Sequence, residues 1–163
     1  MTVTSVEKDY DNLQIVLTAD FSVPIEQVWD LWADPRKLER WWGPPTWPAT
    51  VVEHSLEPGG SVTYYMTGPE GEKSRGWWKI TSANPPTSLE FVDGFSDLDG
   101  NPVDALPTQR ATVELTPTSG GTRMIMRSQL SSREHMDKLV GMGMIEGLTA
   151  SAGQMDAILA EAA

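Results

Sequence analysis

Apolar and polar residues alternate with a period of two along much of this chain, which is the pattern of half-buried β-strands. Residues 109–116 show it most cleanly, because Ala111, Val113 and Leu115 fall on one face. The same reasoning predicts strands over residues 12–19, 49–56, 61–67, 73–82, 88–95, 109–116 and 122–129. Most links between the later strands are short and rich in Gly and Pro, so antiparallel neighbours are expected.

Two segments depart from this pattern. Residues 1–10 are expected to form a loosely ordered N-terminus. Residues 96–107 (SDLDGNPVDALP) are polar and rich in turn-forming residues, so they are expected to form a surface loop.

After residue 131 the period changes to that of a helix. Ser131 and Glu134 match a capping box, and apolar residues then recur at helical spacing to about residue 161. Gly141 and Gly143 interrupt the pattern, so a break is expected over 141–143, with the straight helix mainly after Ile145.

A pair of short helices is expected between the first two strands. Asp34 is a good N-cap and Pro35 suits a first helical turn, whereas Gly43 and Pro44 end a helix. One helix should therefore end near Ala33 and the next should cover residues 35–42. The predicted fold class is α+β: a seven-stranded antiparallel sheet whose apolar face is covered by the C-terminal helix, in one domain over residues 1–163.

The helix pair also carries a longer motif. The pattern P-x-x-x-V-W…D-P-x-x-L-x-x-W-W-G-P occurs here as Pro24, Val28, Trp29, Asp34, Pro35, Leu38, Trp41, Trp42, Gly43 and Pro44. Weaker fragments follow in order: Pro58-Gly59-Gly60, Gly76 before Trp77-Trp78, Pro85-Pro86 before Leu89, and Gly120-Gly121-Thr122. Over about residues 13–160 the chain resembles the START-like (SRPBCC) superfamily, in particular the family named after the C-terminal domain of the activator of heat-shock protein 90 ATPase.

This resemblance implies a helix-grip fold, in which a curved sheet holds a long C-terminal helix across its concave side and two short helices close one end. Because the superfamily binds lipids, polyketides, aromatic metabolites and hormones, it also implies a small hydrophobic ligand. The leading hypothesis is a small-molecule binding domain with an apolar cavity between sheet and helix. The strand faces and helical spacing assign nine lining residues: Tyr64, Met66, Trp78, Phe91, Val113, Met124, Met126, Ile145 and Leu148.

Two alternative functions stay open. The family name implies a protein-interaction module of the chaperone-ATPase-activator type, although the resemblance covers only the C-terminal domain of that activator. A polyketide-cyclase-like enzyme would need an acid or base in its pocket, for which Glu53, His54, Tyr64 and Arg110 are the candidates. No sequence feature selects one of these as catalytic, so no catalytic residue is assigned.

The amino-acid composition excludes some classes of binding partner. The chain has 23 acidic and 12 basic residues, a formal net charge of −11, which argues against nucleic acid and against an anionic membrane surface. It has no cysteine, no apolar run that approaches the ~20 residues of a membrane span, and no signal-peptide pattern at its start. A cytoplasmic location is therefore expected.

The residues that usually hold metals or cofactors are sparse. His54 and His135, the two histidines, are far apart in sequence, so neither a metal nor a cofactor is expected. The glycines of 141–147 follow no strand and do not fit a dinucleotide fingerprint, and residues 97–102 fit an Asp-Gly turn better than a calcium loop.

The spacing of small residues on the last helix suggests that a homodimer is possible. Gly143, Gly147 and Ser151 recur every four positions on the last helix and would let another backbone approach closely. The partner could be the chain's own sheet or a second copy, in which case an outward tryptophan of the pair 41–42 or 77–78 should join the contact.

Overall fold

The computed structural model describes residues 3–97 and 108–161. Its strands are β1 (Val3–Asp9), β2 (Gln14–Phe21), β3 (Ala49–His54), β4 (Ser61–Thr67), β5 (Lys73–Asn84), β6 (Ser88–Ser96), β7 (Gln109–Thr118) and β8 (Gly121–Gln129). Its helices are α1 (Ile25–Ala33), α2 (Pro35–Trp41), α3 (Arg133–Gly141), α4 (Met144–Gly153) and α5 (Met155–Glu161). None of the helices in this part of the chain is long and apolar enough to cross a membrane.

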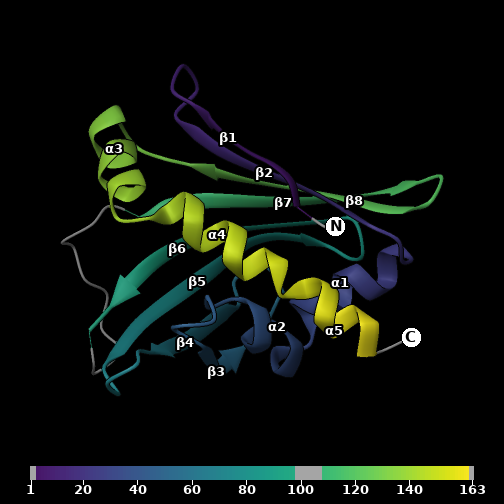
Figure 1. Cartoon of the computed structure of the whole chain (residues 1–163), viewed down its shortest axis with the longest axis horizontal. Coiled ribbons are helices and arrows are strands. Elements are labelled where there is room, and N and C mark those ends of the chain that lie inside the picture. Colours follow the sequence, from purple (N-terminus) through teal and green to yellow (C-terminus); the bar gives the residue numbers. More distant parts are fainter. Residues whose placement is uncertain (1–2, 98–107, 162–163) are drawn as a thin grey trace.

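The strands form one antiparallel sheet in the order β1-β2-β8-β7-β6-β5-β4-β3. Strands β3 to β8 follow one another as neighbours, and the β1–β2 hairpin joins them by pairing β2 with β8. The sheet is curved, with α4 and α5 crossing one of its faces and α3 beyond one end of them (Figure 1). The predicted α+β class and antiparallel pairing are confirmed.

The number of strands corrects the expectation of seven, because the described residues form a sheet of eight. The predicted loose N-terminus is wrong for residues 3–9, which form β1 and pair with β2. Val6 packs partly buried against the core, but it is the only apolar residue between residues 4 and 9. Backbone hydrogen bonds to β2 therefore stabilise this strand more than burial of apolar side chains does. For this reason the periodicity of apolar residues could not predict the strand.

The C-terminal helical region is broken where the glycines predict. Helix α3 ends at Gly141, and Gly143 precedes α4 with a left-handed backbone (φ +91°), which glycine adopts without strain. A second, unpredicted break at Gln154 separates α4 from α5, although both run on in nearly the same direction (Figure 1). The cap is also shifted by one residue from the predicted box, because Ser132 Oγ accepts the His135 backbone N–H at 3.0 Å.

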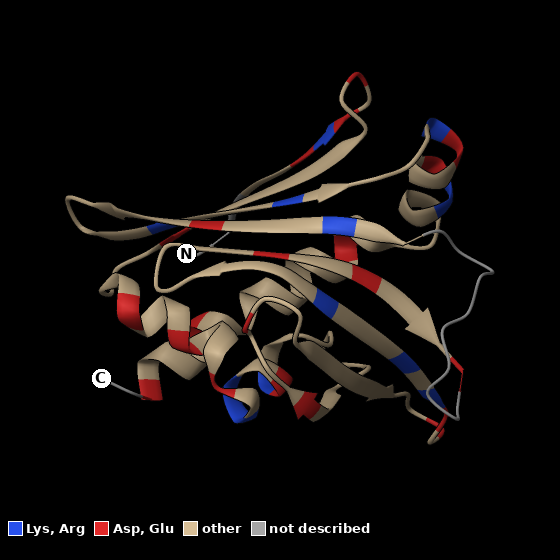
Figure 2. Cartoon of the chain, turned by 180° about the vertical axis from the view of Figure 1, so that it is seen from behind, with Lys and Arg blue, Asp and Glu red and all other residues tan. Residues whose placement is uncertain are grey.

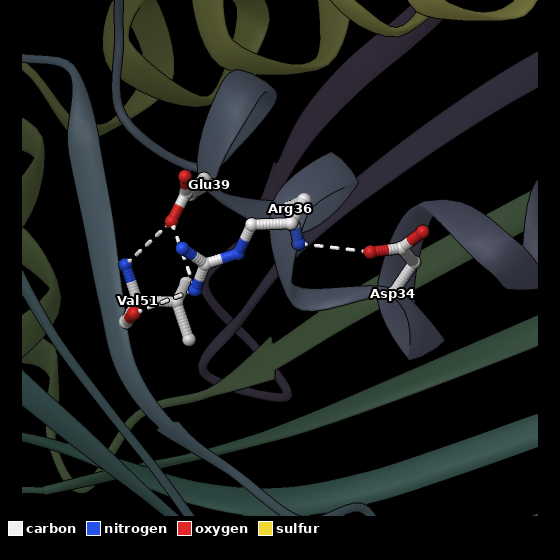
Figure 3. A network of polar contacts seen from close by, with 4 residues as sticks. All are labelled: Asp34, Arg36, Glu39 and Val51. Atoms are coloured by element: carbon white, nitrogen blue, oxygen red, sulfur yellow. Dashed lines mark hydrogen bonds and ion pairs between the residues drawn. The ribbon is translucent and has the colours of Figure 1, made fainter.

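The predicted helix pair is confirmed, and its polar side chains bind the edge strand β3 (Figure 3). Asp34 caps α2 by accepting the Arg36 N–H at 2.9 Å. Arg36 Nη2 donates to the Val51 carbonyl at 2.9 Å, and Glu39 accepts the Val51 N–H at 3.0 Å. Both backbone groups of Val51 are therefore hydrogen-bonded although β3 is an edge strand. They are then not available to pair with a strand of another molecule.

The core contains a cluster of five rings: Trp32, Trp41, Trp42, Trp78 and Phe91. Trp78 stacks on Phe91 with centroids 4.0 Å apart, and the Trp32 centroid lies 4.7 Å from that of Trp41. Trp41 Nε1 donates to the Leu31 carbonyl at 2.7 Å, which ties α2 to α1. The helix pair is thereby packed against one end of the concave sheet face.

The opposite face of the sheet is charged. In Figure 2 Lys and Arg (blue) and Asp and Glu (red) are both spread over the strands seen from behind. Arg123 pairs with Asp20 at 2.9 Å, and Arg127 with Glu114 at 3.1 Å, both across neighbouring strands. Such exposed pairs each contribute about 0–1 kcal/mol, so their main effect is to mark this face as the solvated one.

Candidate functional site

A cavity of about 350 Å³ lies between the concave face of the sheet and the C-terminal helices. Side chains of β2, β4, β6, β7 and β8 line one side of it, and α3 and α4 line the other. Phe95 and Met142 belong to the lining and are 40% and 63% exposed, so the cavity meets solvent near them. Most of the lining is apolar, which suits an organic ligand.

Five of the nine residues assigned to the cavity from the sequence do line it. They are Tyr64 and Met66 of β4, Met124 and Met126 of β8, and Leu148 of α4. The strand faces were therefore assigned correctly for β4 and β8.

The other four assigned residues lie outside the lining. Trp78, Phe91 and Val113 are on the concave face but are completely buried beneath other side chains. Ile145 packs instead against a second apolar cluster that includes Ile15. Periodicity identifies the face on which a residue lies, but it does not show which part of that face is covered by rings and which is left open.

The small residues of the last helix also face the cavity. Gly143, Gly147 and Ser151 all belong to its lining, and a Cβ added to Gly147 would meet no atom within 4 Å. These small residues therefore leave open volume in the cavity inside the protein. Association with a second copy of the chain stays a prediction. Trp77 lies partly exposed on the outer face of the sheet, whereas Trp78 points inward. A contact of Trp77 with a second copy also stays a prediction.

Polar residues that the sequence analysis did not select lie together at one end of the cavity. Asp93 of β6 is directly opposite Gln109 of β7, and Ser128 of β8 is paired with Ala111, two residues further along β7. Gln109 Nε2 donates to Asp93 Oδ2 at 3.0 Å. This orientation turns Gln109 Oε1 away, and that oxygen is buried without a hydrogen-bond partner among the described residues.

The environment of Asp93 alters its acidity. Its side chain keeps some accessible surface at the cavity, yet protein atoms surround the carboxyl closely. Burial raises the pKa of Asp93 to about 7, against the opposing effect of hydrogen bonds from Gln109 and the backbone of Gly94. The group therefore changes charge near neutral pH.

Tyr64 brings a hydroxyl to the same region. Its ring lies across Gly76, the residue opposite it on β5. Burial, and then the nearby Asp93 carboxyl, raise the pKa of Tyr64 well above its usual value, so the hydroxyl stays protonated.

Replacing Gly76 with alanine is expected to lower the free energy of unfolding by about 1–3 kcal/mol, because it overpacks this contact. A Cβ at residue 76 would lie 2.3 Å from the Tyr64 hydroxyl oxygen. Gly120→Ala, where an added Cβ meets nothing within 4 Å, is the control. Urea unfolding of both variants measures the difference, and equal stabilities would contradict the expected contact.

His135 supplies a nitrogen donor to the lining. Its Nδ1 accepts the Ser131 backbone N–H at 3.3 Å, so in the neutral ring Nε2 carries the proton. Burial, and then Lys138, lower the pKa of His135, which keeps the ring neutral at neutral pH.

The other candidate catalytic residues lie elsewhere. Of the four named from the sequence, only Tyr64 lines the cavity. His54 Nε2 lies 3.0 Å from the Trp32 carbonyl oxygen and belongs to a separate, shallow pocket. Arg110 pairs with Glu90 at 3.6 Å on the outer face, and Glu53 is exposed. These residues are not brought together around one site.

Potential metal ligands are not clustered in the described part of the chain. Among residues 3–97 and 108–161, no three His, Asp or Glu side chains gather closely enough to hold an ion. Most of the Asp-Gly segment 97–102 lies outside the described residues.

A curved antiparallel sheet, a helix pair at one end and a C-terminal helical region across the concave face define a helix-grip protein of the SRPBCC (START-like) superfamily. The family model "Activator of Hsp90 ATPase homolog 1-like protein" matches residues 22–160. The chain belongs to this family, as its tryptophan-rich motif suggested.

Solved structures agree with this assignment. The solution structure of a protein from Arthrobacter aurescens is 50% identical with a TM-score of 0.94, covering 98% of this chain and 93% of that one. Protein Ms6760 from Mycobacterium smegmatis is 46% identical with a TM-score of 0.89, covering 96% of each chain. The AHSA1 protein from Silicibacter pomeroyi is 25% identical with a TM-score of 0.73, covering 92% of this chain and 99% of that one. No protein with a curated description is similar to this chain in sequence.

Proposed function

We propose that this protein binds a small, mainly apolar organic molecule in the cavity between the sheet and α3–α4. The observation that carries the proposal is the cavity itself: about 350 Å³, mostly apolar, with a few polar groups at one end. Sites for organic ligands commonly start at about 300 Å³ and combine apolar walls with a small number of placed polar groups.

The exposed apolar side chains support the same proposal. Val52, Phe95 and Met142 are the large apolar residues that the described part of the chain leaves most exposed. Two of them, Phe95 and Met142, belong to the cavity lining. An entrance for an apolar ligand accounts for their exposure, which otherwise costs free energy in water.

The methionines of the lining suit a ligand of variable shape. Met66, Met124, Met126 and Met144 all border the cavity. Unbranched, polarizable thioether side chains adapt to irregular shapes at low cost. This composition favours a binding pocket over a rigidly shaped catalytic site.

The test has two steps: the small molecule that co-purifies with the protein is identified, and a substitution then places a side chain in the cavity. Gently purified protein is expected to release a small molecule on denaturation, detected by mass spectrometry. Gly147→Leu places a side chain in the open space beside Gly147 and is expected to lower the bound amount by on the order of tenfold or more. Leucine also favours a helix over glycine by about 0.8 kcal/mol, so α4 should be retained.

The chain offers a matched control on the same helix. Gly153 has equally open surroundings, but it is exposed and lies outside the cavity lining. Gly153→Leu should therefore keep the ligand. Wild-type protein that carries no small molecule and binds no apolar fluorescent probe would reject the proposed function.

A further inference from the structure

The polar end of the cavity holds the ionisable carboxyl group of Asp93 among neutral polar groups and aromatic rings. Asp93 contributes a carboxyl group, and Gln109 contributes a buried amide oxygen that lacks a partner among the described residues. The rings of Trp42 and Tyr64 line the same cavity with centroids 6.0 Å apart. A carboxyl group beside aromatic rings favours a ligand group that carries a positive charge and can donate hydrogen bonds.

Asp93 also lacks a positive partner. No ion pair involves it in the described part of the chain. Residues 1–2, 98–107 and 162–163, which complete the chain, contain no Lys, Arg or His. A carboxyl group that is surrounded by protein atoms and has no positive partner is costly to ionise, unless the ligand brings a cation.

Neighbouring groups from the other elements leave this charge uncompensated. Tyr64 of β4 stays protonated, Gln109 of β7 is neutral, and the pKa of His135 on α3 is lowered. The chain's net charge of −11 further raises the local concentration of cations around the entrance.

We propose that the cavity binds an organic amine, with its ammonium group against the carboxyl group of Asp93 and its apolar body along Met124, Met126 and Leu148. The ammonium group supplies three donors and the missing positive charge at once. The faces of Trp42 and Tyr64 add cation–π attraction. This inference rests on the proposed binding function and specifies the chemical class of its ligand.

The experiment compares three probes that share one apolar body: 4-phenylbutylamine, 4-phenylbutan-1-ol and 4-phenylbutyrate. Binding to the full-length protein is measured by calorimetry at about pH 8, where an alkylamine is still protonated. The amine is expected to bind about tenfold or more tighter than the alcohol, and the acid weakest, because one charge pair of this kind is worth at least a factor of ten. At about pH 5 the preference for the amine should shrink, since Asp93 then takes up a proton.

Two variants locate the effect. Asp93→Asn should reduce the ratio of amine to alcohol affinity to about one, because the neutral amide no longer attracts the ammonium group. Asp137→Asn removes an equal charge from the exposed face of α3 and should keep the wild-type ratio, which separates the local carboxyl from the net charge.

Three results would overturn the inference: the alcohol or acid binding as tightly as the amine, a preference that survives in Asp93→Asn, or binding of none of the probes. The proposed function is judged separately by the co-purified molecule and by Gly147→Leu. A carried ligand without a basic nitrogen would therefore reject the amine and leave the binding function standing.

Discussion

Replacing Trp32 with alanine is expected to lower the free energy of unfolding by about 3–5 kcal/mol, the cost of removing a large ring from a packed core. Trp32 is completely buried, and its centroid lies 4.7 Å from Trp41, 6.1 Å from Trp42 and 6.0 Å from Trp78. Four other rings would lose contacts together, Phe91 included, and the helix pair could not collapse into the space without leaving the sheet.

Trp77→Ala is the matched control for this change. Trp77 lies on the outer face, partly exposed, with its ring over Gly94 and its Nε1 donating to the Phe95 carbonyl at 3.1 Å. Its removal should cost about 1 kcal/mol, near the average for single substitutions. Urea unfolding followed by far-ultraviolet circular dichroism measures both variants. Equal losses would mean that the buried ring cluster is not the main contributor at this end of the sheet.

Replacing Asp93 with asparagine is expected to stabilise the unliganded protein, and to do so more at high pH. The folded-state pKa is raised to about 7 from a usual value of 3.8. Below about pH 4 the carboxyl is protonated in both states, whereas between about pH 4 and 7 the unfolded chain loses the proton first. The free energy of unfolding of the wild-type protein therefore falls as pH rises from about 4 to 7. Above about pH 7 the carboxyl is ionised in both states and the loss of stability is complete.

The gain of the variant should reach about 2–4 kcal/mol at pH 8, since each pKa unit corresponds to about 1.4 kcal/mol and partial exposure reduces the effect. Asparagine can keep the hydrogen bond from Gln109 and leaves no charge to bury. Unfolding at about pH 5 and pH 8 measures the gain. His135 titrates alike in both proteins and cancels in the difference.

Asp137→Asn, an exposed change of the same chemistry, is expected to alter stability by less than about 0.5 kcal/mol at either pH. A gain in Asp93→Asn that is equal at both pH values would show that the carboxyl is not held out of water. If the gain is found together with weaker amine binding, Asp93 costs stability in exchange for recognition.

Residue patterns predicted most of the fold, because faces and turns leave direct traces in the sequence. The change of period after residue 131 marked the helical end, and Gly143 marked its break. Strand β1 left no such trace, since its pairing uses backbone groups that every sequence possesses.

The polar end of the cavity could have been found from the sequence only in part. Asp93 continues the inward series of Leu89 and Phe91, as Ser128 continues that of Met124 and Met126. Each series therefore ends in a polar residue on the inner face. That both ends border one cavity, although β7 lies between their strands, follows from strand order and register, which the periodicity of a single strand does not contain.

The order of the strands has a consequence for synthesis on the ribosome. Strands β3 to β8 can pair one after another as they emerge, but β2 must wait for β8, whose Gln129 pairs with Gln14. Until the last strand is made, the β1–β2 hairpin keeps an unpaired edge and its inward side chains stay uncovered. Such long-range pairing slows folding and exposes the nascent chain to aggregation. The period in which a chaperone would be of most use to this chain therefore lasts until its final strand has emerged.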